Sequence, residues 1–407
     1  MRLIYDIGIR IYWLTARVIS PWNRKAKLWL HGRKGWYQEL SSAFEPGDRV
    51  TWFHCASLGE FEQGRPVIEA SRKHFPGSKI LLTFFSPSGY EKRKNFEGAD
   101  HVMYLPLDTR KNARRMLESL QLERAIFIKY EFWYHFLQEL SKQNIPTYLA
   151  SGNFRKDQMF FKWYGSWYRS FLRCFTHIFV QKENSRDLLR GIGYHNVSVA
   201  GDTRFDRVRE LPQSPYSHEA MEGFCSGSPV LVAGSTWEKD EQMLARAYGE
   251  LSQELRWIIA PHELSASHLS SLLKRFPGSV LFTQLKKEVP SGTRAIIVDT
   301  IGQLSYLYRF GTLAYIGGGF GKGIHNILEA ATYGLPVIFG PAYHKFSEAV
   351  ELTELGGAFP VEEEDQLLFT IRQQLENSEL LKTASQVAEE FVHERVGATS
   401  RILAKCE

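Results

Sequence analysis

Cysteine is scarce in this chain, with four residues among 407. No two of them form a CxxC pair or show the spacing of metal ligands, the four being Cys55, Cys174, Cys225 and Cys406. This scarcity argues against a small secreted fold held by disulfides and against a structural zinc site, and it indicates a reducing cytosolic compartment.

Long uncharged apolar runs are missing as well. The first 22 residues are rich in Ile, Leu, Tyr and Trp, but Asp6, Arg10 and Arg17 interrupt them. A membrane-spanning helix needs about 20 consecutive, mostly apolar residues, and a signal peptide needs a small-residue cleavage site after a short apolar core. We therefore expect neither.

Several motifs of known chemistry are also lacking, namely GxxxxGK[ST], HExxH, GxSxG and any Asp-rich metal loop. P-loop chemistry and hydrolase triads are therefore disfavoured. A nicotinamide cofactor is not the first expectation either, because the glycines at 317–323 do not have the GxGxxG spacing.

Positive charge is present, but at one end of the chain. Residues 1–40 hold eight Lys and Arg residues against Asp6 and Glu39, a net charge of +6 that leaves −1 of the total +5 for the rest. A neutral body argues against nucleic-acid binding. The N-terminal segment is an apolar helix with a basic flank, expected to lie on an anionic membrane surface with Trp13 and Trp22 at headgroup depth. The alternative is a helix packed on its own domain.

Beyond this segment, short β-rich runs alternate with helical sequence, which predicts mostly parallel sheets covered on both faces. The predicted strands lie at 50–55, 79–85, 101–108, 124–133, 146–153, 175–181, 196–202, 230–236, 255–261, 279–284, 295–300, 313–319 and 335–341. The fold class is therefore α/β, with two domains that face a central cleft, where ligands bind outside the carboxyl ends of the strands. The predicted parts are the basic segment 1–40, a domain at 41–210, a Pro- and Ser-rich linker at 211–229, a domain at 230–388, and a helix at 389–407 that crosses back to the first domain.

The stretch from Gly311 to Phe346 reads as a strand, a glycine-rich turn, a helix over about Asn326–Tyr333 and a second strand. Such a turn offers backbone N–H groups to an anion, and Asn326 and Glu329 could contact a base or a ribose. The same two residues also form a helix-capping pair, so the pattern alone does not decide between the two roles.

Other polar residues follow predicted strands in the first domain. Glu60 lies at the start of a predicted helix. It could take a proton from a hydroxyl there, or it could simply be an acidic residue that is stabilised by the helix dipole. Ser57 and Gly59 precede it, and the turn of Ser86, Ser88 and Gly89 suits a phosphate or a sugar hydroxyl as well as it suits a plain turn.

These residues fall within motifs that, taken together along nearly the whole chain, resemble the Kdo transferases, which attach 3-deoxy-manno-octulosonic acid to the lipid A precursor of Gram-negative bacteria. The motifs are HCASLGE (54–60), SPSG (86–89), YLPLD (104–108), YEFW (130–133), SGNFR (151–155), GDTRFD (201–206), GSTWEKDE (234–241), PHE (261–263), DTIGQL (299–304) and GGGF…HNILEAA…P…GP after Gly317.

The resemblance implies a GT-B glycosyltransferase with two Rossmann-like domains, the acceptor in the first and CMP-Kdo in the second. It implies no metal and no cofactor, since CMP-Kdo is a substrate. It implies that Glu60 is the general base for inverting transfer and that Glu131 and Arg204 take part in catalysis. It implies nucleotide contacts from Pro261, His262, Gly302, Gln303, Leu304, Asn326, Ile327, Leu328 and Glu329. The partners would be CMP-Kdo, the lipid A precursor and an anionic membrane surface, at the cytoplasmic face of the inner membrane.

Three positions depart from the pattern of the family. Lys129 stands where an acid is common, Arg204 replaces the usual lysine, and His262 replaces an arginine. A transition-state role of the missing acid cannot be carried over, whereas Arg204 remains a cation and His262 is a weaker, pH-dependent one.

Two other functions fit the pattern less closely. One is a GT-B transferase or sugar-nucleotide epimerase that uses a UDP-sugar, and the other is a membrane scaffold with a degenerate fold of this type. Preference for CMP over UDP and the effect of Glu60→Gln separate the three.

Overall fold

The computed structural model describes residues 1–251 and 253–406, which form two compact units. Unit 1 comprises Met1–Asp206 and the segment from Val396 onward, and unit 2 comprises Arg207–Arg395. Each unit is a parallel sheet covered by helices, so the predicted α/β class with two Rossmann-like domains is confirmed.

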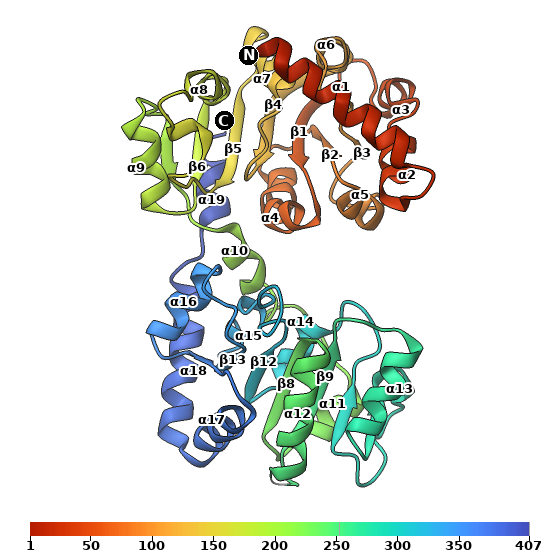
Figure 1. The fold of residues 1–407 in the computed structure, drawn as a ribbon, viewed down its shortest axis with the longest axis vertical. Coiled ribbons are helices and arrows are strands. Elements are labelled where there is room, and N and C mark those ends of the chain that lie inside the picture. Colours follow the sequence, from red (N-terminus) through yellow and green to blue (C-terminus); the bar gives the residue numbers. More distant parts are fainter. Residues whose placement is uncertain (252, 407) are drawn as a thin grey trace. The chain divides into compact units, whose positions relative to one another are not determined.

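Unit 1 is built on seven parallel strands in the order β3-β2-β1-β4-β5-β6-β7 (Figure 1). The strands are β1 (Arg49–Cys55), β2 (Ser78–Phe84), β3 (His101–Tyr104), β4 (Gln121–Ile128), β5 (Thr147–Gly152), β6 (His177–Val180) and β7 (Val197–Val199). The helices are α1 (Arg2–Ile19), α2 (Arg24–His31), α3 (Trp36–Ala43), α4 (Leu58–His74), α5 (Pro87–Arg93), α6 (Arg110–Glu118), α7 (Tyr134–Lys142), the 3-10 turn η1 (Met159–Phe161), α8 (Ser166–Leu172), α9 (Glu183–Gly191), α10 (Thr203–Arg209, at the junction) and α19 (Ala398–Leu403). Every residue of β1 after Arg49 is buried, as expected of a strand covered on both faces.

Unit 2 repeats the design with seven parallel strands in the order β10-β11-β9-β8-β12-β13-β14. The strands are β8 (Val230–Thr236), β9 (Arg256–Pro261), β10 (Ser279–Leu281), β11 (Ala295–Ile297), β12 (Leu313–Ile316), β13 (Val337–Phe339) and β14 (Ala358–Pro360). The helices are α11 (Glu219–Cys225), α12 (Glu238–Glu250), α13 (Ala266–Arg275), η2 (Phe282–Gln284), α14 (Leu304–Leu307), η3 (Tyr308–Phe310), α15 (Leu328–Ala331), α16 (Ser347–Glu354), α17 (Glu364–Glu376) and α18 (Ser378–His393).

The strand order of each sheet reverses beside the first strand of the unit. β1 lies between β2 and β4, and β8 lies between β9 and β12. Ligands of open α/β sheets bind outside the carboxyl ends of the strands at such a reversal. The residues that follow β1, β4, β8 and β12 are therefore the first candidates for a site.

Helix α1 is held on unit 1 by polar contacts of its first turns. The Tyr5 hydroxyl donates to the buried carboxylate of Asp108, which also accepts the backbone N–H of His135 at 3.1 Å. The ring Nε2 of His135 lies 2.5 Å from Oδ1 of Asp6. These contacts join α1 to residues more than 100 positions later in the chain.

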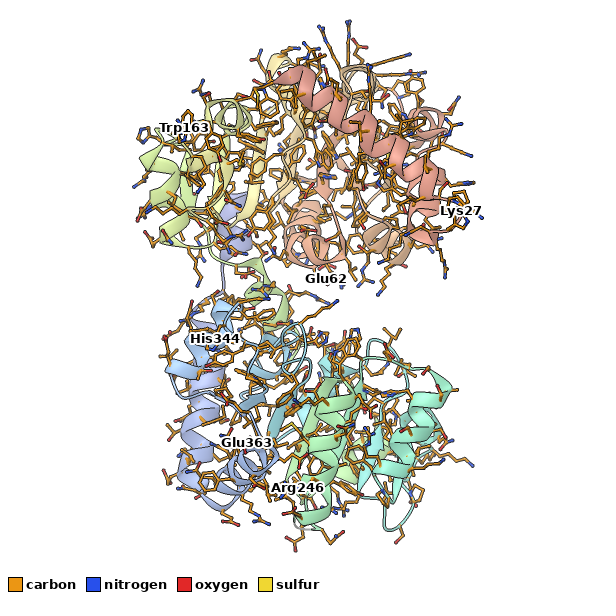
Figure 2. The ribbon with its side chains drawn as sticks, viewed as in Figure 1. Lys27, Glu62, Trp163, Arg246, His344 and Glu363 are labelled. Carbon is orange, nitrogen blue, oxygen red and sulfur yellow. The ribbon has the colours of Figure 1, made fainter. Side chains whose placement is uncertain are left out.

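The other side of α1 exposes an apolar row, which we name the outer stripe. Its members are 47% to 71% exposed and are Leu3, Ile7, Ile11, Leu14 and Val18. Basic side chains follow on α2, including the exposed Lys27 (Figure 2). Within residues 1–251 and 253–406, no helix combines the length and the apolar character needed to cross a bilayer.

Several predicted boundaries need correction. β3 ends at Tyr104 because Pro106 follows, and the predicted helix over Asn326–Tyr333 is only the short α15. The sequence 211–229 is not a free linker, since it contains α11 and the Arg309 guanidinium binds the carbonyls of Leu211, Ser214 and Tyr216.

The C-terminal region also differs from the single helix predicted at 389–407. It holds α18, which ends at His393, and then α19, with Gly397 between them at a φ of 97°. The carboxylate of Asp206 accepts the backbone N–H of Thr399 at 2.7 Å, and Ile402 is fully buried in unit 1. Strand β14 was not predicted, because its three residues carry too little pattern.

The stability of the protein should depend on His177 at mildly acidic pH. This β6 side chain is buried beside the Ser198 hydroxyl, 2.9 Å from Nε2. Burial first, and the charge of Lys405 second, lower the pKa of His177 from about 6.5 to about 4. Because the unfolded chain takes up this proton at a higher pH, stability should fall from pH 6.5 down to pH 4, by up to about 1.4 kcal/mol per pH unit.

Thermal unfolding at pH 7, 6 and 5 measures this dependence. The parent should lose more of its melting temperature between pH 7 and 5 than His177→Gln, whose side chain can still bond Ser198 but does not titrate. Equal losses in the two proteins would contradict the assignment to His177.

Candidate active site

The ends of β1 and β4 carry a buried polar group of residues in unit 1. Nε2 of His54 lies 3.2 Å from Oε2 of Glu131, and Nε1 of Trp133 donates to the same oxygen at 2.7 Å. Nδ1 of His54 lies 2.8 Å from Oγ1 of Thr83, which also receives the indole N–H of Trp52 at 2.8 Å. All of these bonds form if the Thr83 hydroxyl donates to Nδ1 and His54 carries its proton on Nε2. We name His54, Glu131 and Trp133 the His54 cluster.

The backbone after β4 explains how Glu131 reaches His54. Lys129 has a φ of 71°, a left-handed conformation that is uncommon for a residue other than glycine. The chain turns sharply there, and its N–H stays bound to the Ala150 carbonyl of β5 at 2.8 Å. Such conformations gather at functional sites. The Lys129 ammonium lies 5.6 Å from the centre of the Tyr130 ring.

Glu60 lies in the first turn of α4, three residues after Ser57, the residue that caps the helix. The Ser57 hydroxyl donates to the Glu60 carboxylate, and both side chains are partly exposed. Gly59, between them, is exposed. The carboxylate is thus held by one hydroxyl while it stays open to solvent, as a general base requires.

The turn after β2 has a structural role. Oγ of Ser86 accepts the N–H of Ser88 at 3.2 Å, and a Cβ on Gly89 would come within 2.3 Å of the Phe84 ring. The helix that follows, α5, has only seven residues. These contacts favour the plain turn over the phosphate site, although Ser88 remains exposed.

A buried arginine supports the same turn. The guanidinium of Arg33 donates to the carbonyls of Trp29, Phe85 and Leu105, each at 2.8 Å. Burial lowers its pKa to about 9, so it remains charged at neutral pH. Arg33 thereby ties α2 to the residues that follow β2 and β3.

Arg204 lies at the start of α10 and is bound by a neighbouring carboxylate. Its Nε and Nη2 donate to Oδ2 of Asp202 at 2.9 and 2.7 Å. The side chain is 28% exposed. Asp202 therefore orients this guanidinium.

In unit 2, Asp240 organises the residues after β8 and β12. Its buried carboxylate accepts the backbone N–H of Trp237 and of Gly318, both at 2.9 Å, and the hydroxyl of Tyr315 at 2.8 Å. The preceding Ser235 has a φ of 54°, a second left-handed turn at a strand end. One carboxylate thus fixes the start of α12 against the glycine-rich turn.

Three flat rings lie over this edge of the sheet. The ring of His262 stacks on Trp237 with centroids 4.4 Å apart and on His325 at 4.8 Å. The indole N–H of Trp237 donates to Nε2 of His325 at 3.1 Å. Burial, and then the charge of His262, lower the pKa of His325. His325 is therefore neutral at neutral pH and accepts through Nε2.

The glycine-rich turn uses part of its backbone for contacts within unit 2. The N–H groups of 317, 318, 321, 323 and 325 all bind acceptors within unit 2. A Cβ on Gly317 would come within 2.3 Å of the Ser235 carbonyl, and one on Gly319 within 2.5 Å of the Gly340 nitrogen. Glycine is needed here because two backbones pack together.

The predicted nucleotide residues gather around the same edge. Oδ1 of Asn326 accepts the N–H of Leu328 at 3.1 Å and its amide donates to Glu329 at 3.1 Å, so the two side chains hold each other at the start of α15, whose N-cap residue is Ile327. Ile327 and Leu328 are buried and support the turn, whereas Asn326 and Glu329 are partly exposed.

The other predicted nucleotide residues follow β9, at Pro261 and His262, or lie at the start of α14, at 302–304. Pro261 ends β9 beside the end of β8, and His262 joins the ring stack. Gly302 has a φ of 93°, and Gln303 accepts the Tyr216 hydroxyl at 3.2 Å. Leu304 approaches Gly234 of β8. The structure therefore brings the predicted nucleotide residues together at the carboxyl ends of β8, β9 and β12.

Glu238, Glu241 and His268 also lie close together, between α12 and α13. Arg275 already supplies a cation there, 2.6 Å from Glu238 and 3.5 Å from Glu241. Burial raises the pKa of Glu241. This group is an ion-pair network outside the candidate site.

Sequence reasoning quoted His54, Trp237, Asp240 and His325 within motifs but did not select them as site residues. Their signal was present, because each stands at or just after the end of a predicted strand. Their partners were not visible, since the pairs of His54 with Glu131 and of Asp240 with Gly318 join residues 77 and 78 positions apart.

Comparison with known proteins extends this description. The family model described as "3-Deoxy-D-manno-octulosonic-acid transferase (kdotransferase)" matches residues 29–207. A 3-deoxy-D-manno-octulosonic acid transferase of Chlamydophila psittaci is 27% identical over 86% of this chain and 83% of its own length. One of Bordetella pertussis is 25% identical over 98% of both chains.

A solved structure matches at lower identity. The UDP-GlcNAc 2-epimerase of Neisseria meningitidis, crystallised with UDP-GlcNAc, has a TM-score of 0.61 and 16% identity over 88% of this chain and 99% of its own. At that identity the likeness concerns the fold alone. Both units therefore have counterparts in solved and curated proteins.

Proposed function

Since the chain belongs to the 3-deoxy-D-manno-octulosonic acid transferase family, we propose that it moves Kdo from CMP-Kdo to the lipid A precursor in lipopolysaccharide biosynthesis. The observation that carries this proposal is the match to curated transferases over both units, up to 98% of the chain. The fold is of the GT-B type, as the resemblance implied.

In this reaction an acceptor hydroxyl attacks the anomeric carbon of Kdo, and CMP leaves from the opposite face with inversion. Glu60 takes the proton of the attacking hydroxyl, because its carboxylate is partly exposed and is fixed by Ser57. Glu131 positions the acceptor, since His54 and Trp133 hold its Oε2. Arg204, held by Asp202, offers a cation to the donor carboxylate or the leaving phosphate.

Unit 2 binds the nucleotide part of CMP-Kdo. Asn326 and Glu329 contact the ribose or the base, while His262 faces the phosphate from the ring stack. His325 is neutral there, so it stacks and accepts a hydrogen bond rather than adding charge. No metal is required in this scheme, because the proton acceptor and the cation are both side chains.

We further propose that the enzyme works at the cytoplasmic face of the inner membrane, where its lipid acceptor resides. The outer stripe of α1 supplies apolar contact and Arg24, Lys25 and Lys27 supply charge, the two signals that stable peripheral binding needs.

A stripe variant tests the membrane proposal. Ile7→Ser/Ile11→Ser/Leu14→Ser should bind vesicles of phosphatidylethanolamine with phosphatidylglycerol at least about 100-fold more weakly, because each lost side chain removes about 2 kcal/mol of burial. Cosedimentation measures it. The control is Phe369→Ser, which removes a side chain 64% exposed on α17 of unit 2. Unchanged sedimentation of the stripe variant would refute membrane contact through α1.

The test of the function itself is direct. The protein is incubated with CMP-Kdo and the lipid A precursor, and added sugars are counted by mass spectrometry. Thermal stabilisation by CMP is compared with that by UDP at equal concentration. Kdo transfer with CMP preference is expected, whereas UDP preference without transfer would favour the enzymes that use UDP-sugars.

A further inference from the structure

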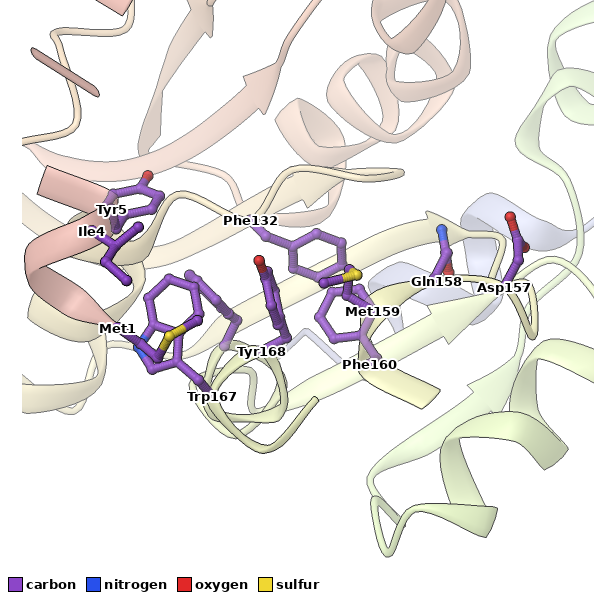
Figure 3. A pocket seen from close by; sticks show the side chains of 11 residues that line it. Met1, Ile4, Tyr5, Phe132, Asp157, Gln158, Met159, Phe160, Trp167 and Tyr168 are labelled. Atoms are coloured by element: carbon purple, nitrogen blue, oxygen red, sulfur yellow. The ribbon is translucent and has the colours of Figure 1, made fainter. Parts of the chain in front are cut away.

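Unit 1 contains an apolar cavity of about 550 Å³ that the reaction described above does not use (Figure 3). Three segments line it, namely the first turn of α1, the loop after β4, and residues 157–171 around η1 and α8. The side chains that form its walls include Ile4, Phe132, Phe160, Trp167 and Tyr168. Its size and its largely apolar lining suit a flexible hydrocarbon.

The outer end of the cavity continues an exposed apolar surface. Met1 and Ile4 are 60% and 65% exposed, and Met159 on the other side is 39% exposed. Trp163 and Tyr164 follow in the loop before α8, where Trp163 is 91% exposed (Figure 2). Exposed Trp and Tyr beside an apolar face are typical of side chains at membrane headgroup depth.

The inner end of the cavity adjoins the candidate site. Phe132 lines the cavity and packs on Phe160 with ring centroids 4.9 Å apart. The residues before and after Phe132 are Glu131 and Trp133 of the His54 cluster. The indole N–H of Trp133 donates to the Glu131 carboxylate at 2.7 Å. The cavity therefore shares a wall residue, Phe132, with the loop that carries the His54 cluster.

The charge around the cavity suits an anionic lipid. Arg155 and Lys156 are exposed beside the lining residue Asp157, and Lys162 follows Phe161. Arg155 also reaches the Tyr130 hydroxyl at 3.5 Å, next to Glu131. Arg155 also lies 3.6 Å from the carboxylate of Asp157, which lines the cavity. Lys156 and Lys162 add two further cations beside the lining residues, which suits a molecule with an acidic head and an apolar tail.

We propose that this cavity binds one acyl chain of the lipid acceptor and thereby holds the acceptor sugar at the His54 cluster. The proposal rests on the proposed function and deepens it, because it assigns recognition of the lipid part to Phe132, Phe160, Trp167 and Tyr168. Binding of the chain at this distance from the reacting hydroxyl provides the energy that positions it.

Cavity-filling variants test the proposal. Gln158→Trp and, separately, Ile4→Trp place an indole in the cavity, and Phe369→Trp on α17 is the matched control. The substrates are the acylated acceptor and the same acceptor after removal of its acyl chains by alkali. We expect kcat/KM to fall about tenfold or more for the acylated acceptor, mainly through KM, and less than twofold for the deacylated one.

Losses that are equal for both acceptors in the two variants, or no loss for either, would overturn the acyl site while the transferase function stands. Failure of the parent to transfer Kdo to either acceptor would instead overturn the proposed function.

Photolabelling provides a readout that does not depend on turnover. The parent is illuminated with the acceptor, and separately with phosphatidylethanolamine, each carrying a diazirine on one acyl chain. We expect the acceptor to label the peptide 157–172, and Gln158→Trp to lose this label, whereas either lipid can label the peptide 1–10 because the outer stripe of α1 contacts the bilayer. Equal labelling of the peptide 157–172 by phosphatidylethanolamine, or no labelling there, would overturn the proposal of an acceptor subsite.

Discussion

Glu60→Gln should lower kcat for Kdo transfer by about 10²- to 10⁴-fold, the usual contribution of a general base. The amide keeps the shape of the side chain and can still accept the Ser57 hydroxyl, but it cannot take a proton. Binding of CMP should be unchanged, because the nucleotide residues belong to unit 2. Single-turnover kinetics with saturating CMP-Kdo measures the rate, and calorimetry measures the binding.

Glu62→Gln is the matched control for this experiment. Glu62 lies two residues further along α4 and pairs with Arg93 at 2.9 Å, with a side chain that is 39% exposed (Figure 2). Its loss should change transfer less than twofold, since an exposed pair contributes little. A Glu60→Gln protein with parental rates would exclude Glu60 as the base.

Asp240→Ala should both destabilise the protein and abolish measurable CMP binding. The substitution leaves the N–H groups of Trp237 and Gly318 and the Tyr315 hydroxyl without their acceptor. Loss of one buried partner costs about 1–3 kcal/mol, so we expect a total loss of about 3 kcal/mol or more. The loops after β8 and β12 should then separate, and the ring stack with His262 should lose its support.

Asp240→Asn distinguishes geometry from charge. The amide oxygen can accept the two backbone N–H groups while its nitrogen donates to the Tyr315 oxygen, so this variant should keep most of its stability and CMP affinity. Thermal unfolding and CMP titration of both variants measure the difference. If Asp240→Ala bound CMP like the parent, Asp240 would not organise the nucleotide site.

Much of the fold follows from local pattern. Buried β-rich runs such as 50–55 predict strands, and their alternation with helical sequence predicts parallel sheets. The position of Glu60 was also visible, because a glycine turn after a predicted strand marks the start of a helix there. Very short strands were less predictable. The three residues of β14 carry no periodicity, and this strand was not predicted.

The contacts that define the site could not be read from the sequence, because they depend on strand order. His54 meets Glu131 only because β4 pairs directly with β1, while β2 and β3 lie on the other side. The sequence likewise does not reveal that Lys129 and Ser235 adopt left-handed conformations, since surrounding structure imposes them against local preference. For a related reason the sequence does not reveal that Gly317 and Gly319 let two backbones pack together.

The way α1 is fastened also has a consequence for how the chain is made. Its partners Asp108 and His135 follow Tyr5 and Asp6 by 103 and 129 residues. At about 5–20 residues per second, α1 leaves the ribosome roughly 5–25 s before these partners are synthesised. Under the membrane proposal, the outer stripe can adsorb to the bilayer during that interval. Unit 1 would then assemble around a helix that is already adsorbed, so that translation order itself delivers the enzyme to its lipid.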